Sequence, residues 1–283
     1  MKRILSIQDI SCFGRCSQTV ALPIISALGI ETVILPTALL STHTGDFSNY
    51  SFLPLNNEIK NITEHWKSIN LTFDAIYVGY IGTSELVDNI VCIIDEFSDK
   101  NTLIYIDPAM ADNASLYSGI DMEYVSRIKE LCKKADIICP NIYEAMLLSD
   151  FNCTHDYTTQ DIEYITKKAG ELAKKTIITG IHKGEEILTL GYERNSKASK
   201  KIINKKYDGM FYGTGDIFAS TFIGAYLNGI DFFDSIAFSD GFVQKCIENT
   251  ISEHKKYWYG INFESCLSCL TEFYNNKKIN PHG

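Results

Sequence analysis

Two glycines, a threonine and an aspartate stand together in the stretch "GMFYGTGDIFASTFIGAYL", which runs from Gly209 to Leu227. Gly213 and Gly215 allow a tight backbone turn and the close approach of another group. Helical spacing then follows in the apolar residues Ile217, Phe218, Thr221, Phe222, Ala225 and Tyr226. The corner therefore leads into a helix whose first N–H groups are free, and such a helix start attracts anions. Asp216 is then either a favourable helix-start charge or a carboxylate placed beside a bound anion.

Two further acidic stretches could act on the same ligand. Asp107 in "YIDPAMAD" follows an apolar run, and Pro108 after it stops strand pairing and leaves the carboxylate at the rim. Asn141 and Glu144 in "CPNIYEA" begin a helix with a carboxylate one turn in. Each is also a common capping device when taken separately. Together with an anion-binding turn, Asp107, Asn141 and Glu144 suit the binding of Mg²⁺, which is held through one or two carboxylates plus nucleotide phosphates.

Strand-like and helix-like stretches alternate along the first two thirds of the chain. The expected strands lie in "RILSIQ", "TVILPTALL", "DAIYVGY", "TLIYIDPAM", "ADIICPN" and "TIITGI". Helices are expected in "TVALPIISALG" and over Glu58–Ile69, Glu85–Phe97, Met122–Lys133 and Thr159–Lys174. This order predicts an α/β fold with a doubly wound, mostly parallel sheet and helices on both faces.

The last third of the chain follows a different pattern. Glu186–Tyr192 and Lys201–Asp208 are expected to pair as antiparallel strands across the polar "ERNSKASK". Helices are expected over Asp216–Leu227, Phe232–Ser252 and Phe263–Tyr274. Because no linker or internal repeat interrupts the chain, we expect residues 1–283 to form one domain.

Ligands of open α/β sheets bind beyond the carboxyl ends of the strands, so the polar residues there are the candidates for a site. They are Gln8, Asp9, Thr42, His43, Thr44, Tyr80, Thr83, Asp107, Asp112, Asn141, Glu144 and Thr179. We expect them to share one edge with the Gly-Thr-Gly-Asp corner.

Composition narrows the classes of function. The 283 residues are 45% hydrophobic and 22% charged, with a formal net charge of −9, so no basic surface for nucleic acid is expected. No apolar run reaches the length of a membrane span, and "MKRILSIQDI" lacks the features of a secretory signal. We expect a cytoplasmic protein that binds neither nucleic acid nor membrane.

The cysteines do not form a disulfide framework. Nine is an odd number, and the cysteines are scattered, so reduced thiols are expected. Cys266 and Cys269 have the spacing of a zinc half-site, but no second pair accompanies them. The stretch "FESCLSCLTEFY" is better explained as one apolar helix face.

Over nearly its whole length the chain resembles the ribokinase-like small-molecule kinases, and among them the vitamin B6 (pyridoxal/pyridoxamine) kinases. The matching stretches are "ILSIQDISCFG", "STHTG", "GYIGT", "DPAMAD", "PNIYEA" and "GTGDIFAS". The "GTGD", "DP" and "PN--E" elements are fairly specific to the superfamily, whereas "STHTG" with "GYIGT" points to the B6 branch rather than to sugar kinases. The resemblance implies ATP-dependent phosphorylation of the 5′-hydroxymethyl group of pyridoxamine, pyridoxal or pyridoxine. It also suggests a homodimer.

The resemblance gives each candidate residue a role. Asp216 would take the proton from the substrate hydroxymethyl group, while Gly213, Thr214 and Gly215 would donate N–H groups to the transferring phosphoryl group. Asp107 and Glu144, with Asn141, would serve Mg²⁺ and the phosphates, directly or through water. Positions near the nucleotide phosphates are matched by Asp112, Tyr117 and Thr179, and the pyridine pocket is matched by His43, Thr44 and Tyr80. A requirement for a monovalent cation stays open.

One departure from the family bears on the substrate. Many pyridoxal kinases carry Ser in an "IQSH" stretch where this chain has Asp9 in "IQDI". A carboxylate at the tip of the first strand, beside the pyridine ring, would favour the ammonium group of pyridoxamine. The alternative is that Asp9 caps the following turn through "DIS".

The nearest competing function is that of the hydroxymethylpyrimidine (phosphate) kinases of thiamine synthesis. Some dual-activity members carry a cysteine just before the glycine corner, where this chain has Tyr212, so trapping of pyridoxal by a cysteine is not expected there. Other nucleotide-binding folds fit less well. The first turn has Gly14 alone, not Gly-x-Gly-x-x-Gly, and Gly215 is followed by Asp216 and not by the lysine of a Walker motif. A non-enzymatic relative would be expected to have lost these carboxylates.

Overall fold

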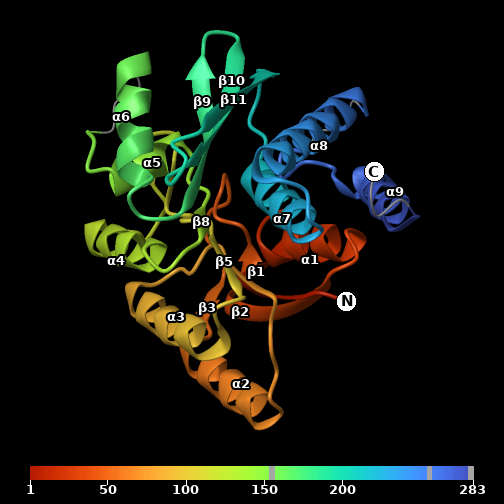
Figure 1. Ribbon diagram of the computed structural model, residues 1–283. Coiled ribbons are helices and arrows are strands. Elements are labelled where there is room, and N and C mark those ends of the chain that lie inside the picture. Colours follow the sequence, from red (N-terminus) through yellow and green to blue (C-terminus); the bar gives the residue numbers. More distant parts are fainter. Residues whose placement is uncertain (153–156, 254–256, 280–283) are drawn as a thin grey trace.

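A nine-stranded sheet in the order β11-β10-β9-β8-β5-β4-β1-β2-β3 runs through the centre of the molecule (Figure 1). The computed structural model describes residues 1–152, 157–253 and 257–279. The strands of this sheet are β1 Arg3–Phe13, β2 Glu31–Thr42, β3 Phe52–Pro54, β4 Ala75–Val78, β5 Leu103–Ile106, β8 Ile137–Ile138, β9 Lys175–Lys183, β10 Glu186–Glu193 and β11 Ser199–Lys205. A separate two-stranded hairpin consists of β6 Ala111–Asp112 and β7 Ser115–Leu116.

The middle of the sheet is parallel and its two edges are antiparallel. β1 pairs in parallel with β2 and β4, and the parallel pairing continues from β4 through β5 and β8 to β9. β10 and β11 extend one edge in antiparallel pairs, and β3 closes the other edge against β2. The predicted mostly parallel sheet and the predicted antiparallel pair are both confirmed.

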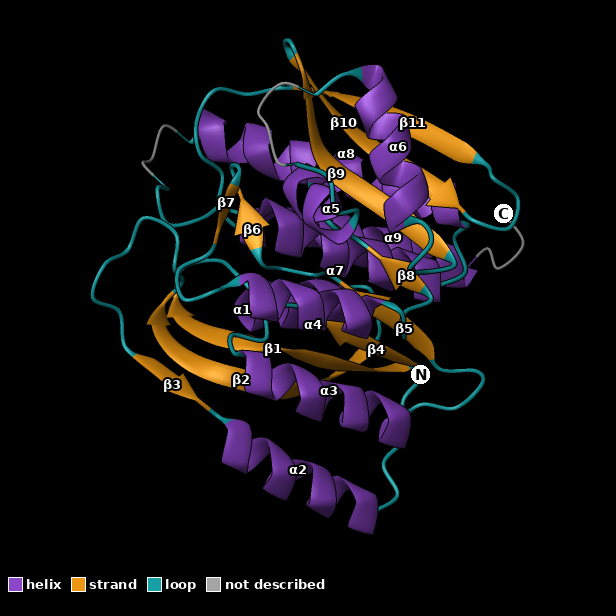
Figure 2. Ribbon diagram, turned by 90° about the vertical axis from the view of Figure 1, so that its left-hand side faces the viewer, coloured by secondary structure: helices purple, strands orange, loops and turns teal. Residues whose placement is uncertain are grey.

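Helices cover both faces of the sheet (Figure 2). They are α1 Gln18–Ala27, α2 Asn56–Ser68, α3 Ser84–Phe97, α4 Met122–Cys132, α5 Ile142–Leu148, α6 Thr159–Ala169, α7 Thr214–Leu227, α8 Phe232–Ser252 and α9 Leu267–Ile279, with a 3-10 turn η1 at Glu264–Cys266. Neighbouring strand residues point to opposite faces, so Ile4 packs among α1, α7, α8 and α9, whereas Leu5 packs among α2, α3 and α4. Among the described helices, none is both long and apolar enough to cross a membrane.

Several boundaries differ from the sequence expectations, and three short strands were not expected. β1 continues to Phe13, because its second half pairs with Leu39–Thr42 of β2. The helix expected over Thr159–Lys174 ends at Ala169, since Gly170 caps it. The helix expected over Phe263–Tyr274 starts as η1 and continues as α9 to Ile279. The strand β3 and the β6–β7 hairpin were not predicted, since both are too short to show a period.

Candidate active site

A cavity of about 620 Å³ lies beyond the carboxyl ends of the parallel strands, and it is lined by Asp9 and by every residue to which the resemblance assigns a role. These residues are Asp9, His43, Thr44, Tyr80, Asp107, Asp112, Tyr117, Asn141, Glu144, Thr179, Gly213, Thr214, Gly215 and Asp216. Gln8, Thr42 and Thr83, which were also expected at this edge of the sheet, do not line the cavity. The Gln8 amide donates to Ser6 Oγ at 2.8 Å inside the core, and Thr83 is the N-cap of α3.

The Gly-Thr-Gly-Asp corner forms the start of α7. Gly213 is the N-cap with φ 87°, and a Cβ there would lie 2.0 Å from the carbonyl oxygen of Arg15, so the fold requires glycine. Gly215 is different, because a Cβ there would meet no described atom within 4 Å other than its chain neighbours and the backbone of its own helix. The missing side chain at Gly215 keeps space clear beside the free N–H groups of the helix start.

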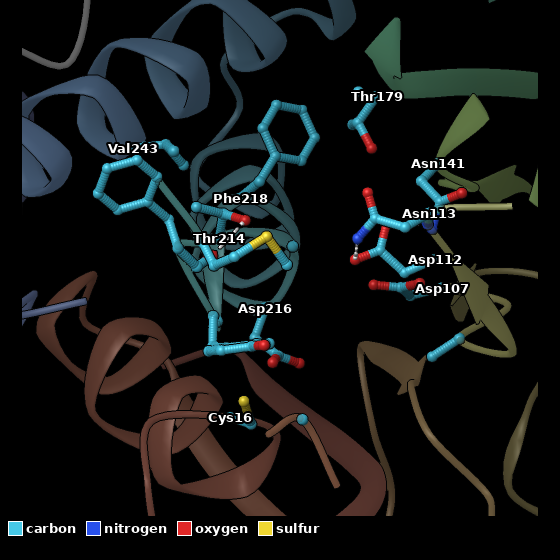
Figure 3. Close-up of a pocket in the computed structure, with 18 of the residues that line it drawn as sticks. Cys16, Asp107, Asp112, Asn113, Asn141, Thr179, Thr214, Asp216, Phe218 and Val243 are labelled. Carbon is cyan, nitrogen blue, oxygen red and sulfur yellow. Dashed lines mark hydrogen bonds between the residues drawn. The ribbon is translucent and has the colours of Figure 1, made fainter. Parts of the chain in front are cut away.

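Asp216 lies in the first turn of α7 and lines the cavity. Burial raises its pKa to about 7, a hydrogen bond from the backbone of Ser17 opposes the rise, and the charge of Asp9 adds to it. Figure 3 shows Cys16 next to Asp216. Burial, followed by the charges of Asp216 and Asp9, raises the Cys16 pKa well above its ordinary value, so this neighbour is a neutral thiol. The titration range of Asp216 suits a proton acceptor that works near neutral pH.

A second acidic group faces Asp216 across the cavity (Figure 3). Burial, and then the charges of Glu144 and Asp216, raise the pKa of Asp107 well above its ordinary value. Burial also raises the pKa of Glu144 to about 8, against hydrogen bonds from backbone N–H groups. The carboxylates of Asp107, Glu144 and Asp216 repel one another when ionised. A divalent cation between them would reduce this repulsion.

The carboxyl groups of Asp107 and Glu144 differ in how free they are to bind a cation. Glu144 Oε1 accepts the Met110 N–H at 3.0 Å, and Glu144 Oε2 accepts the Asn141 N–H at 2.8 Å within a capping box. Asp107 accepts no hydrogen bond from the described part of the chain. Among the described residues, no three His, Cys, Asp or Glu side chains could hold a metal by themselves. The arrangement therefore fits a Mg²⁺ ion that brings its own waters and phosphate ligands, because the Asp107 carboxyl is free to bind a cation while both Glu144 oxygens already accept backbone N–H groups.

Asp9 lies inside β1 and not at its tip, so the expectation of a strand-end carboxylate was wrong in position. The cause is the pairing of β1 with β2 beyond Gln8, which continues the strand to Phe13. Ser11 Oγ donates to Asp9 Oδ2 at 2.8 Å, and the Ser17 side chain is a second hydrogen-bond partner. Burial raises the Asp9 pKa despite these hydrogen bonds. The Ser11 contact agrees with the local "DIS" alternative, although the carboxyl group also lines the cavity.

His43 presents its ring to the cavity while both ring nitrogens are occupied. Nδ1 accepts the Gly45 N–H at 3.1 Å, and Nε2 lies 3.0 Å from the Tyr259 carbonyl oxygen, to which it donates. Burial lowers the His43 pKa, so the ring is neutral. Tyr212 packs against it with ring centroids 5.2 Å apart. His43 therefore offers an aromatic surface and not a proton or a charge.

The opposite end of the cavity is formed by the β6–β7 hairpin, the start of α5 and β9. Asn141 fixes the hairpin through its side-chain amide, which donates to the Ala111 carbonyl oxygen at 2.7 Å, and it pairs with Thr179 in a parallel bridge. Burial raises the pKa of Asp112, whose Oδ1 accepts the Asn113 N–H at 2.8 Å. Burial also raises the Tyr117 pKa well above its ordinary value, so its hydroxyl is a neutral donor.

Sequence reasoning missed several lining residues. They include Cys16, Ser17, His182, Thr189, Asn204, Lys205, Lys206 and Asp240. Asp240 carried a signal, since it shares the apolar helical face of Ile236, Val243 and Ile247, where a carboxylate is out of place. The others stand in loops or on the strands β9, β10 and β11, and they have no periodic signal. The cysteines of the described residues are all free thiols, and Cys153 lies outside those residues.

Comparison with known proteins agrees with this geometry. The family model described as phosphomethylpyrimidine kinase matches residues 22–259. The pyridoxal kinase of Sus scrofa is 29% identical over 238 residues, which are 77% of this chain and 73% of that protein.

Two solved structures have a similar fold. One is a Bacteroides thetaiotaomicron protein assigned as a phosphomethylpyrimidine kinase, in an orthorhombic form with pyridoxal. It superposes with a TM-score of 0.91 at 31% identity and covers 95% of both chains. The other is the pyridoxal kinase of Leishmania donovani in complex with ADP and pyridoxamine, with a TM-score of 0.86 at 20% identity over 95% of this chain and 96% of that one; at this identity it shows the fold alone. The chain therefore belongs to the phosphomethylpyrimidine kinase family, in the pyridoxal kinase group of the ribokinase-like superfamily.

Proposed function

We propose that this protein transfers the γ-phosphoryl group of ATP to the 5′-hydroxymethyl group of a B6 vitamer, as pyridoxal/pyridoxamine kinases do. The observation that carries the proposal is the position of Asp216, a half-buried carboxyl with a pKa of about 7 beside the free N–H groups of the Gly-Thr-Gly corner. A proton acceptor and an anion site thus lie within one turn of helix. Pyridoxal in the crystals of the 31% identical relative supports a pyridine substrate.

In the proposed reaction the substrate hydroxyl lies against Asp216. The hydroxyl oxygen forms a bond to the γ-phosphorus, its proton moves to the Asp216 carboxylate, and the bond from that phosphorus to the β-phosphate oxygen breaks to release ADP. The N–H groups of Gly213, Thr214 and Gly215 stabilise the negative charge on the transferring group. Catalysis of this kind depends mostly on the positions of the reacting groups. The contact between Gly213 and Arg15 would fix the position of the Gly-Thr-Gly-Asp corner.

The acceptor end of the cavity would hold the pyridine ring. His43, neutral and flanked by Tyr212, offers a flat surface for it, and Thr44 and Tyr80 bring hydroxyl groups to the same end. Burial and the nearby charge of Asp9 raise the Tyr80 pKa, so its hydroxyl stays a donor. Asp9 would face the 4-position substituent and favour pyridoxamine.

The donor end would hold the nucleotide phosphates against Asp112, Tyr117, Asn141 and Thr179. When bound, Mg²⁺ would neutralise phosphate charge near Asp107, with Glu144 acting through water. The ADP in the Leishmania donovani complex supports an adenine nucleotide as the donor.

A second candidate is phosphorylation of hydroxymethylpyrimidine or its phosphate. It is favoured by the name of the matching family model and of the 31% identical structure. Both substrates carry a hydroxymethyl group on a flat nitrogen heterocycle, so the same corner could serve either. Measuring ATP consumption with pyridoxal, pyridoxine, pyridoxamine and hydroxymethylpyrimidine separates the two: a kcat/KM for the pyrimidine above that of all three vitamers would favour the second candidate.

The remaining assignments are also proposals. We infer one kinase domain over residues 1–283, a cytoplasmic location and a homodimer, as the resemblance to B6 kinases implies. Sedimentation of the purified protein tests the dimer.

A further inference from the structure

Arg15, in the loop between β1 and α1, does not line the cavity, yet its side chain is only 16% exposed. Nε donates to Glu264 Oε1 at 2.8 Å, and Nη1 donates to the Gly260 carbonyl oxygen at 3.1 Å. The guanidinium group also lies over the rings of Tyr257 and Tyr259, 4.9 and 5.3 Å from their centroids. Only a planar guanidinium can make in-plane hydrogen bonds and stack on two rings at once, so lysine could not replace it.

These contacts hold residues 257–261, which connect α8 to the segment before η1 and belong to no helix or strand. The Arg15 N–H donates to the Tyr259 carbonyl oxygen at 3.3 Å. A Cβ on Gly260 would lie 2.7 Å from the Arg15 Cβ, so the two backbones are in close contact. Because residues 257–261 are not part of a helix or sheet, their position depends on contacts such as those with Arg15.

The same residues contact both rings that form the proposed surface for the pyridine. The Tyr259 carbonyl oxygen accepts a hydrogen bond from His43 Nε2 at 3.0 Å. The Ile261 N–H donates to the Tyr212 carbonyl oxygen at 3.2 Å. Residues 257–261 therefore lie behind His43 and Tyr212 and hold each of them by one hydrogen bond.

The hydrogen bond to Tyr259 determines how the His43 ring is placed. Nδ1 accepts the Gly45 N–H, so Nε2 carries the ring proton and needs an acceptor. The ring also packs against the Gly14 backbone, because a Cβ on Gly14 would lie 2.3 Å from His43 Cδ2. If the Tyr259 carbonyl group moved away, Nε2–H would lose its acceptor, and the ring would be free to rotate or to exchange its tautomer.

We propose that Arg15 is a positioning residue for the phosphoryl acceptor, acting through residues 257–261 on the ring of His43. The inference rests on the proposed function, since it concerns the surface on which the B6 vitamer would bind. The side chain of Arg15 makes this connection, whereas its backbone carbonyl oxygen is the group that lies against Gly213. Replacing the side chain should therefore disturb the acceptor surface and leave the Gly-Thr-Gly-Asp corner in place.

The first test is steady-state kinetics of Arg15→Met with ATP and the best B6 vitamer. The KM for the vitamer should rise about tenfold, which corresponds to the loss of one aromatic stacking contact. The KM for ATP, kcat and the rise of kcat with pH should stay close to the wild type, because the corner and the donor end are unchanged. Arg15→Lys should not restore the KM, since lysine keeps the charge and loses the planar contacts.

Arg3 provides a matched control. It also pairs with a glutamate and a backbone carbonyl group, through Nη2 to Glu31 at 2.9 Å and Nη1 to the Thr72 oxygen at 3.4 Å. Arg3 begins β1 and so lies at the edge of the sheet opposite the cavity. Arg3→Met and Arg15→Met should both lower the melting temperature, but only Arg15→Met should raise the KM for the vitamer.

The second test observes His43 directly, by ¹⁵N NMR of the histidine rings in the purified full chain without substrate. The His43 signals are those absent from His43→Gln. The wild type and Arg3→Met should show one tautomer, protonated at Nε2, whereas Arg15→Met should show exchange between tautomers.

The outcomes separate this inference from the proposed function. An unchanged KM for the vitamer and a single His43 tautomer in Arg15→Met would overturn the role of Arg15 while the kinase function stands. An equal rise in the KM for ATP would also overturn it, because Arg15 would then support the whole cavity and not the acceptor end. Failure of the wild type to phosphorylate any B6 vitamer would overturn the proposed function, and with it the assignment of an acceptor surface, even if the NMR result shows that Arg15 holds His43.

Discussion

Gly213 lies directly against Arg15, because a Cβ on Gly213 would come within 2.0 Å of the Arg15 carbonyl oxygen. The contact joins the start of α7 to the loop between β1 and α1, although the two segments are far apart in the sequence. The same loop supplies the Ser17 backbone hydrogen bond to Asp216. The anion site and the carboxyl group of the corner are therefore positioned by one contact between two backbones.

The two glycines of the corner should respond differently to alanine. Gly213→Ala should lower the free energy of unfolding by about 1–3 kcal/mol, because its φ of 87° and the Arg15 contact leave no room for a side chain. Gly215→Ala should fold at least as well as the wild type, since alanine favours a helix, but it should lower kcat by filling space beside the phosphoryl group. Thermal unfolding and steady-state kinetics of both variants test this. A stable Gly213→Ala or a fully active Gly215→Ala would contradict it.

Neutralising the carboxyl groups that face Asp216 should change the need for metal. Asp107→Asn should raise the Mg²⁺ concentration for half-maximal rate by about tenfold, and excess Mg²⁺ should partly restore the rate. Glu144→Gln should also raise it and should in addition lower the melting temperature, because its oxygens accept the Met110 and Asn141 N–H groups. Rates titrated with Mg²⁺ give the first result and thermal unfolding the second. If the metal dependence stays the same while stability falls, the carboxyl groups are caps only.

Asp9 should set the preference among B6 vitamers. Asp9→Ser should lower kcat/KM for pyridoxamine by about tenfold to a hundredfold while changing pyridoxal and pyridoxine little, since a charge-assisted hydrogen bond is lost. Ser11→Ala is the control, because it removes the 2.8 Å hydrogen bond to Asp9 and leaves the carboxyl group in place. Equal losses on all three vitamers would mean that Asp9 serves the fold alone.

The buried carboxyl groups should make the protein less stable as the pH rises. A carboxyl whose pKa is raised by folding favours the folded state below its unfolded pKa near 4 and loses that contribution as the pH rises through its folded pKa. For Asp240 the folded value is about 7, so up to about 4 kcal/mol is lost between pH 4 and pH 7. Asp240→Asn should flatten this fall, as measured by urea unfolding at pH 5 and pH 8. An identical fall in wild type and variant would contradict the assignment.

Much of the fold followed from the sequence because its strands and helices differ in period. Short apolar runs ended by polar residues identified the parallel strands, and the pair Glu186–Tyr192 with Lys201–Asp208 was found in β10 and β11. The local sequence pattern did not predict the end of a strand where pairing with a neighbouring strand determines it. β1 continues beyond Gln8 because β2 offers it partners, and no property of residues 9–13 alone requires that.

Part of the cavity lining was predicted, because the carboxyl ends of parallel strands share one edge of the sheet and because the chain resembles the B6 kinases. The roles of these residues in the reaction remain predictions. Asp240 was overlooked because it sits inside a long apolar helix, where the surrounding pattern of Ile236, Val243 and Ile247 hides a single carboxylate. Cys16 was overlooked because its nearness to Asp216 arises from the contact of two distant loops.

The most direct test of the central claim is the turnover of Asp216→Asn with ATP and the best B6 vitamer, followed across pH. In the wild type, kcat should rise with pH through about 7, as the carboxylate that accepts the proton is formed. Asp216→Asn should fold and bind ATP normally, with a kcat about 10²–10⁴-fold lower and without that rise. A folded Asp216→Asn that turns over at nearly the wild-type rate with the same pH profile would contradict the account and leave Asp216 as a charge at the start of a helix.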